Sequence, residues 1–103
     1  MSKEVLEAAI LQVQPEKAAS FEQDFETASQ YISAIEGYLG HSLNRCLEAE
    51  GKYLLLVRWQ NLEAHTKGFR KSAEYLEWKQ ILHHYYDPFP TVEHFEEVYS
   101  QDQ

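Results

Sequence analysis

Hydrophobic residues recur along this chain with two different spacings, and these spacings predict its elements. Residues 5–13, VLEAAILQV, and residues 53–59, YLLLVRW, are apolar at both odd and even positions. A strand with that pattern is covered on both faces of its sheet. Glu7 and Gln12 are the main interruptions of the first run, and Arg58 interrupts the second near its end.

Two polar segments alternate less regularly and predict outer strands at 41–49, HSLNRCLEA, and at 91–99, TVEHFEEVY. Gly51 follows Glu50 in the turn that we expect between the second and third strands. His94 and Glu96 fall on the same face of the last strand, where they either hydrogen-bond to each other or are simply exposed polar residues.

Helical spacing appears in two regions. Pro15 suits the first position of a helix, and Gly37 stops the pattern as a C-terminal cap. Between them, apolar residues recur every three or four positions at Ala18, Phe21, Phe25, Ala28, Ile32 and Ile35. The second region is split into two pieces, which Asn61 and Ser72 are expected to cap. Pro88 ends it.

The predicted order is strand, helix, strand, strand, helix, strand, which is the α+β, ferredoxin-like βαββαβ unit with an antiparallel sheet. Right-handed crossovers place the first and third strands in the middle of that sheet. Helices then cover only one face, although the central strands are apolar on both. A second copy of the sheet would cover the other face, so we predict a homodimer through the sheet face, a dimeric α/β barrel.

Length and charge narrow the class of protein. A chain of 103 residues predicts a single domain, 1–103, with its core at 5–99. The net charge of −8 argues against nucleic acid and anionic membrane surfaces as partners. The lone Cys46, the absence of a signal-peptide pattern and the lack of a long apolar run favour the cytoplasm and no membrane.

Cofactor signals are weak throughout the sequence. His83 and His84 are adjacent, so on a helix they point about 100° apart and do not easily share a metal ion. The glycines at 37, 40, 51 and 68 are isolated and form no phosphate-binding loop. We expect no metal and no other cofactor.

The stretch from residue 52 to residue 87 concentrates the chemistry, with both tryptophans, three of the five histidines and four of the seven tyrosines. Within it, 58–78, RWQNLEAHTKGFRKSAEYLEW, follows the strand YLLLV, and an N-terminal strand leads into PEKAASFEQDF. This pattern resembles the antibiotic biosynthesis monooxygenase family of the dimeric α/β-barrel superfamily. The resemblance implies a homodimer with a cavity between helices and sheet, in which a phenol or quinol is oxidised by molecular oxygen without metal or flavin.

Such a reaction needs an apolar slot, a proton acceptor and donors for the developing oxyanion. His65 is the first candidate for the base, since an ordinary histidine pKa of about 6.5 suits proton transfer near neutrality. The alternative is an exposed His65 on a polar side of its helix. The substrate-binding walls would be Trp59, Phe69, Tyr75 and Trp78, for which ordinary core packing is the alternative.

Two functions therefore stay open. One is a monooxygenase that acts on a small aromatic or quinol-like molecule. The other is a non-catalytic ligand-binding or stress-related homodimer of the same fold, whose pocket holds a ligand without turning it over.

Overall fold

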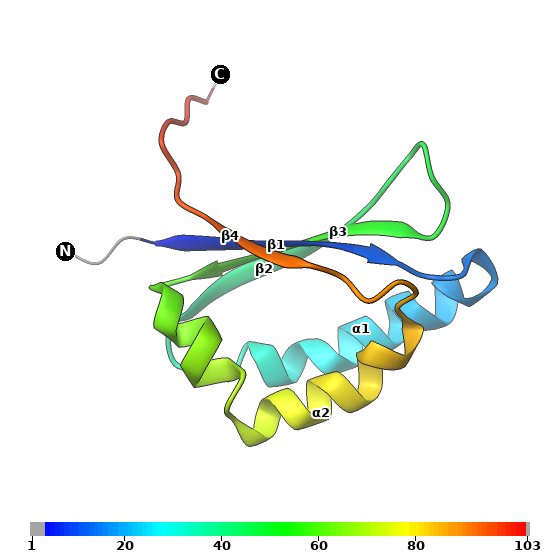
Figure 1. Cartoon of the computed structure of the whole chain (residues 1–103), viewed down its shortest axis with the longest axis horizontal. Coiled ribbons are helices and arrows are strands. Elements are labelled where there is room, and N and C mark those ends of the chain that lie inside the picture. The colour runs from blue at the N-terminus through cyan, green and yellow to red at the C-terminus, as the bar shows by residue number, and fades with distance from the viewer. Residues whose placement is uncertain (1–3, 103) are drawn as a thin grey trace.

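The computed structural model describes residues 4–102, which form two α-helices packed on one face of a four-stranded antiparallel sheet (Figure 1). In chain order the elements are β1 (Val5–Gln12), the 3₁₀ turn η1 (Pro15–Lys17), α1 (Ala18–Ile32), β2 (Tyr38–Arg45), β3 (Lys52–Trp59), the π-helical segment η2 (Ala64–Phe69), α2 (Ala73–Leu82), the 3₁₀ turn η3 (His83–Tyr85) and β4 (Val92–Phe95). The predicted α+β, ferredoxin-like order is confirmed.

The strands lie in the order β2-β3-β1-β4, so the two doubly apolar segments are the central strands, as predicted. β1 pairs with β3 along its whole length, from Val5 opposite Trp59 to Gln12 opposite Lys52. β4 pairs with only four residues of β1, and in that short ladder Glu7 lies opposite His94. The register therefore brings the middle of β1, the end of β3 and the edge strand β4 together.

The core lies between the sheet and the helices. On β1 and β3 every second side chain faces the helices and is buried, while α1 contributes the stripe Phe21, Phe25, Ala28 and Ile32. The strand side of this core is made of Ala9, Leu11, Val13, Tyr53, Leu55, Val57 and Trp59. One charged side chain shares that face, because Glu7 stands two residues before Ala9 and is only 5% exposed.

Within residues 4–102, no helix lies over the opposite face of the sheet (Figure 1). Its apolar side chains come from the central strands: Leu6, Ala8, Ile10, Leu54 and Leu56. In the single chain these residues are at most partly buried, and Ile10 is 43% exposed. An antiparallel sheet can present one face to water, but that face is then usually polar.

Several predicted boundaries are wrong. α1 ends at Ile32 and not just before Gly37, because residues 33–36 form a turn into Gly37, whose φ of 91° reverses the chain. β2 runs from Tyr38 to Arg45 and not over 41–49, since its pairing with β3 begins at Tyr38 opposite Trp59. β4 stops at Phe95 and not at 99, because its only partner is a short part of β1.

Gly51 fixes the turn before β3. Its φ is +81°, and a Cβ added there would lie 2.1 Å from the carbonyl oxygen of Val13. The Val13 amide also donates a hydrogen bond to the Gly51 carbonyl over 2.8 Å. The turn between β2 and β3 is therefore held directly against the end of β1.

Substitution of this glycine tests the close approach. Gly51→Ala should lower the free energy of unfolding by at least about 2 kcal/mol, from the left-handed backbone and the clash with Val13. Gly68→Ala is the matched control, since its added Cβ meets nothing closer than 3.7 Å. The control should change stability by no more than about 1 kcal/mol. Equal urea midpoints for the two variants would contradict the account.

Candidate functional site

His65 is buried in the core, so the alternative of an exposed histidine is wrong. Its side chain is 3% exposed, and its ring stacks on the Trp59 indole with a centroid separation of 5.4 Å and an interplanar angle of 19°. Phe69 lies one turn further on, with its ring 5.8 Å from Trp59. The histidine therefore sits against the aromatic cluster that the sequence singles out.

The local backbone that carries His65 is a widened helical turn. Asn61 Oδ1 accepts a hydrogen bond from the Ala64 amide over 2.8 Å, which confirms the expected cap. The Arg70 amide then reaches back five residues to the His65 carbonyl, 3.1 Å away, as in a π-helix. Such turns are rare and are frequently found at functional sites. Ser72 starts α2 by accepting from the Tyr75 amide over 3.1 Å, so the second expected cap is also confirmed.

A carboxylate that the sequence analysis treated only as an interruption completes the site. Trp59 Nε1 donates to Glu7 Oε1 over 2.9 Å. His65 Nε2 lies 3.4 Å from the same oxygen. The available signal was the position of Glu7 in phase with the buried Ala9 and Leu11, which places a charge on the covered face of a central strand.

His94 extends this cluster towards the edge of the sheet. Its Nε2 lies 2.8 Å from His65 Nδ1, within hydrogen-bond distance. The two alternatives considered for His94, a hydrogen bond to Glu96 or an exposed polar position, did not include this contact with His65. The signal for that contact was hidden in the sheet register, because Glu7 and His94 are opposite each other on β1 and β4.

Burial changes the acid–base properties of both inner groups. It lowers the pKa of His65 to about 3, with smaller contributions from the Arg70 guanidinium and from His94. It raises the pKa of Glu7 above its usual 4.5, although the Trp59 hydrogen bond and Arg70 oppose that shift. The expected near-neutral pKa of His65 is therefore wrong. Glu7 is the stronger proton acceptor of the two, and His65 is neutral near pH 7.

The cavity beside this pair is narrow. It has a volume of about 70 Å³ and lies between the sheet, the helices and the 86–92 segment. Glu7 and His65 line it from one side, and Tyr75, His83 and Tyr86 add polar atoms to an otherwise apolar lining. Small-molecule pockets usually enclose roughly 300–1,000 Å³, so an aromatic substrate needs side chains to move apart.

Only some of the four residues predicted to line the substrate cavity do so. Phe69, Tyr75 and Trp78 line the cavity, whereas Trp59 does not and instead stands behind His65. The same rings also pack as core: the centroid of Phe69 lies 5.1 Å from that of Tyr75 and 5.6 Å from that of Trp78. Wall and core packing are thus combined in these residues.

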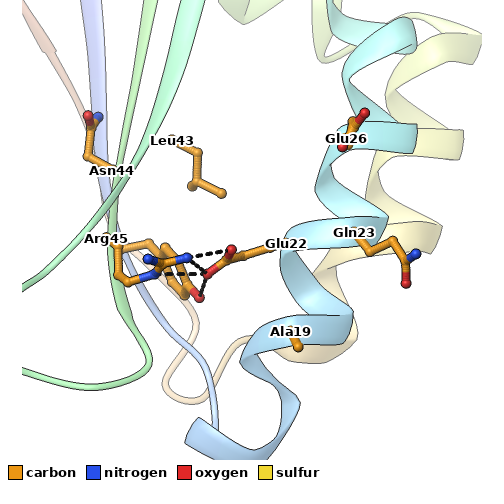
Figure 2. Close-up of a pocket in the computed structure, with 8 residues that line it drawn as sticks. Ala19, Glu22, Gln23, Glu26, Leu43, Asn44 and Arg45 are labelled. Atoms are coloured by element: carbon orange, nitrogen blue, oxygen red, sulfur yellow. Dashed lines mark hydrogen bonds and ion pairs between the residues drawn. The ribbon is translucent and has the colours of Figure 1, made fainter.

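A wider depression of about 870 Å³ lies between α1 and β2 (Figure 2). Three of its polar groups contact one another: Arg45 Nη2 lies 2.7 Å from Glu22 Oε1, and the Tyr53 hydroxyl donates to Glu22 Oε2 over 2.6 Å. These contacts hold α1 on the sheet. We place the candidate site at the smaller cavity because the buried titratable pair faces it.

Two features are absent from residues 4–102. Within that range no group of three or more His, Cys, Asp or Glu side chains is arranged to hold a metal ion. Over the same part of the chain, no helix has the length and apolarity needed to cross a membrane.

Exchange of Glu7 for glutamine tests whether the buried carboxylate costs stability. The amide keeps an oxygen for Trp59 Nε1 and removes the charge. Because the folded-state pKa of Glu7 is raised, the native state loses stability as the pH rises from about 4.5 through that pKa. Glu7→Gln should therefore raise the free energy of unfolding at about pH 8, by on the order of 1 kcal/mol, and much less at about pH 4.5.

Glu22→Gln is the control with the opposite sign. Hydrogen bonds from Tyr53 and Arg45 lower the pKa of Glu22, so its carboxylate stabilises the native state above its unfolded pKa and this contribution is lost as the pH falls. That variant should be less stable than the parent at about pH 8. Urea unfolding of both variants at the two pH values measures the difference, and a shift of the same sign in both would contradict it.

Comparison with known proteins agrees with this fold. The family model described as antibiotic biosynthesis monooxygenase matches residues 5–81. The uncharacterised protein YczJ of Bacillus subtilis (strain 168) is 53% identical over 94 residues, covering 91% of this chain and 99% of YczJ. A crystal structure from Bordetella bronchiseptica, of a protein provisionally named an antibiotic biosynthesis monooxygenase, is 31% identical with a TM-score of 0.89, covering 95% of this chain and 100% of that one.

More distant structures share the fold. SnoaB, a cofactor-independent oxygenase from Streptomyces nogalater, is 22% identical with a TM-score of 0.68, covering 98% of this chain and 97% of that chain. The family match covers most of the chain, and the Bacillus and Bordetella relatives match nearly its full length. The chain therefore belongs to the antibiotic biosynthesis monooxygenase family.

Proposed function

We propose that this protein is a cofactor-independent monooxygenase that oxidises a small aromatic or quinol-like substrate with molecular oxygen. The single observation that carries the proposal is a buried carboxylate, Glu7, beside a neutral imidazole, His65, facing an aromatic cavity. Family membership supports it, as does the cofactor-independent oxygenase SnoaB, which shares the fold.

Glu7 is the group best suited to take the substrate proton. The phenolic O–H bond breaks, the proton passes to the carboxylate and the electron pair stays on the substrate oxygen. The raised pKa of Glu7 makes it a better acceptor than an exposed carboxylate, and His65 beside it receives or returns the proton. The role of base, which the sequence analysis gave to His65 alone, thus passes to Glu7, and His65 acts with it as an acid–base pair.

Arg70 supplies positive charge next to this pair. It lines the cavity, and its charge opposes the raised pKa of Glu7 and lowers the pKa of His65. A cation there favours the phenolate that forms when the proton leaves. The electron-rich phenolate then reduces molecular oxygen. One oxygen atom ends in the substrate, and the other leaves as water with two hydrogens taken from the substrate.

The aromatic lining matches a flat substrate. The rings of Phe69, Tyr75 and Trp78 border the cavity at angles of 79–88° to one another where they meet. Phe89 is 62% exposed and also borders the cavity. Movement of this side chain would enlarge the cavity without disturbing the buried rings.

A specific observation favours a second candidate, a ligand-binding homodimer without catalysis. The cavity holds only about 70 Å³, and its rings are in contact with one another. A protein that only retains a small ligand does not need room for both a quinol and oxygen. Turnover distinguishes the two candidates.

Oxygen uptake with hydroquinone and naphthohydroquinone tests the reaction, with the uncatalysed background subtracted. Glu7→Gln should lower kcat by about 100-fold or more, as expected for loss of a general base, and His65→Ala should lower it by at least about tenfold. Glu22→Gln, a carboxylate outside the cavity, should retain the parent rate. Parent kcat/KM should rise with pH through the raised pKa of Glu7. Equal rates in the parent and Glu7→Gln would remove Glu7 from the mechanism.

We also propose that the chain forms a homodimer through the open face of its sheet. The apolar side chains of β1 and β3 on that face support this, because a partner sheet would remove them from water. Leu56 lies at the centre, between Ala8 of β1 and Ser42 of β2.

Charge introduced at that centre tests the dimer. Leu56→Glu should convert it to a monomer at micromolar concentration, since a carboxylate facing an apolar sheet costs several kcal/mol. Leu76→Glu on α2, where the parent leucine is 63% exposed, is the control and should remain dimeric. Sedimentation velocity gives the result; a monomeric parent would contradict the dimer.

A further inference from the structure

Three titratable side chains from three separate elements form a row at the end of the cavity. Glu7 comes from β1, His65 from η2 and His94 from β4. The row is held by the 3.4 Å approach of His65 Nε2 to Glu7 Oε1 and by the 2.8 Å contact of His65 Nδ1 with His94 Nε2. Each ring nitrogen of His65 therefore faces a different partner.

The two ends of this row lie in different surroundings. Glu7 and His65 are almost fully buried and line the cavity. His94 is not among the cavity-lining residues, is partly exposed and belongs to the edge strand β4. A substrate that fills so small a cavity also covers Glu7, so water cannot reach the carboxylate from that side. The row then connects Glu7 to the sheet edge through two polar contacts, the 3.4 Å approach of His65 to Glu7 and the hydrogen bond between His65 and His94.

We propose that His94 is the outer member of a proton relay that carries the substrate proton from Glu7 through His65 to solvent. This inference rests on the proposed function. His94 does not touch the cavity, so it is a positioning and proton-carrying residue and not a catalytic one.

The transfer balances without any charged form of His65. Glu7 gives its proton to His65 Nε2, while the proton on His65 Nδ1 passes to His94 Nε2. His94 then releases the proton on its own Nδ1 to water. The net result is one proton moved from cavity to solvent, with both imidazoles changed to the other tautomer. When the oxygen-derived group leaves as water, the reverse sequence returns a proton.

The charged and titratable groups around the row favour transfer of a proton along it over a lasting positive charge on either histidine. The Arg70 guanidinium acts on all three groups and disfavours a cation on either imidazole. Burial lowers the pKa values of His65 and His94 in the same direction. The other titratable groups that line the cavity are Tyr75, His83 and Tyr86. A proton that enters the row is therefore not held on either histidine.

Kinetics of His94 variants test the relay. With naphthohydroquinone, His94→Phe should lower kcat by about tenfold or more with little change in KM. His94→Gln, which keeps polar atoms but does not carry a proton in this way, should be impaired to a similar extent. Imidazole added to His94→Ala should restore most of the rate. His84→Gln, at an exposed histidine outside the row, is the matched control. If the His94 variants have the same kcat as the parent, the proposal is overturned.

A second measurement does not depend on turnover. In protein with nitrogen-labelled histidines, the ring nitrogens of His65 and His94 should exchange tautomers together as Glu7 loses its proton, at a pH above 4.5. In Glu7→Gln that joint step should disappear. If the tautomer of His94 does not depend on the protonation state of Glu7, the relay is overturned. If the parent consumes no oxygen with any quinol, the proposed function fails, and these nitrogen shifts then decide whether the row passes protons.

Discussion

A carboxylate held in the core by an indole organises this molecule. Glu7 lies on the covered face of a central strand, where burial alone disfavours its charge, and the Trp59 indole offers it a hydrogen-bond donor at 2.9 Å. Trp59 also carries His65 on its ring face. The Trp59 side chain thus donates a hydrogen bond to the buried acid and also positions the His65 imidazole. Both depend on the β1–β3 ladder, which puts the end of β3 beside the start of β1.

This arrangement trades stability for reactivity. An apolar residue at position 7 would fill the core without a desolvation cost, since a buried charge is expensive even when it is hydrogen-bonded. The carboxylate is retained next to a cavity, which is where a perturbed pKa has a use. His65 shows the complementary effect, because burial keeps it neutral and leaves both ring nitrogens available for hydrogen bonds.

The cavity itself imposes the main constraint on function. Its walls are the same rings that pack the core, so space for a substrate has to come from the exposed part of the lining and not from the sheet. The 86–91 segment is the natural place for this, because Phe89 is largely exposed while Trp78 and Phe69 are buried. The two proposed functions, catalysis and ligand retention, differ in how much space each requires there.

The sequence by itself determined the element order, the central position of the two doubly apolar strands and the caps at Asn61 and Ser72, because these depend on local spacing and on short-range hydrogen bonds. It also concentrated the aromatic residues where the cavity lies. It did not reveal Glu7 as part of the site, because the partners of Glu7, Trp59 and His65, lie more than 50 residues along the chain and only the fold brings them to it.

Only the tertiary structure decided the chemistry of the site. Glu7, the 59–65 segment and His94 are far apart in the chain, and the fold brings them within hydrogen-bond and stacking distance. The pKa of His65 follows from its burial and from Arg70. Neither is a property of local sequence, because desolvation and charge act through space and depend on which segments the fold places side by side.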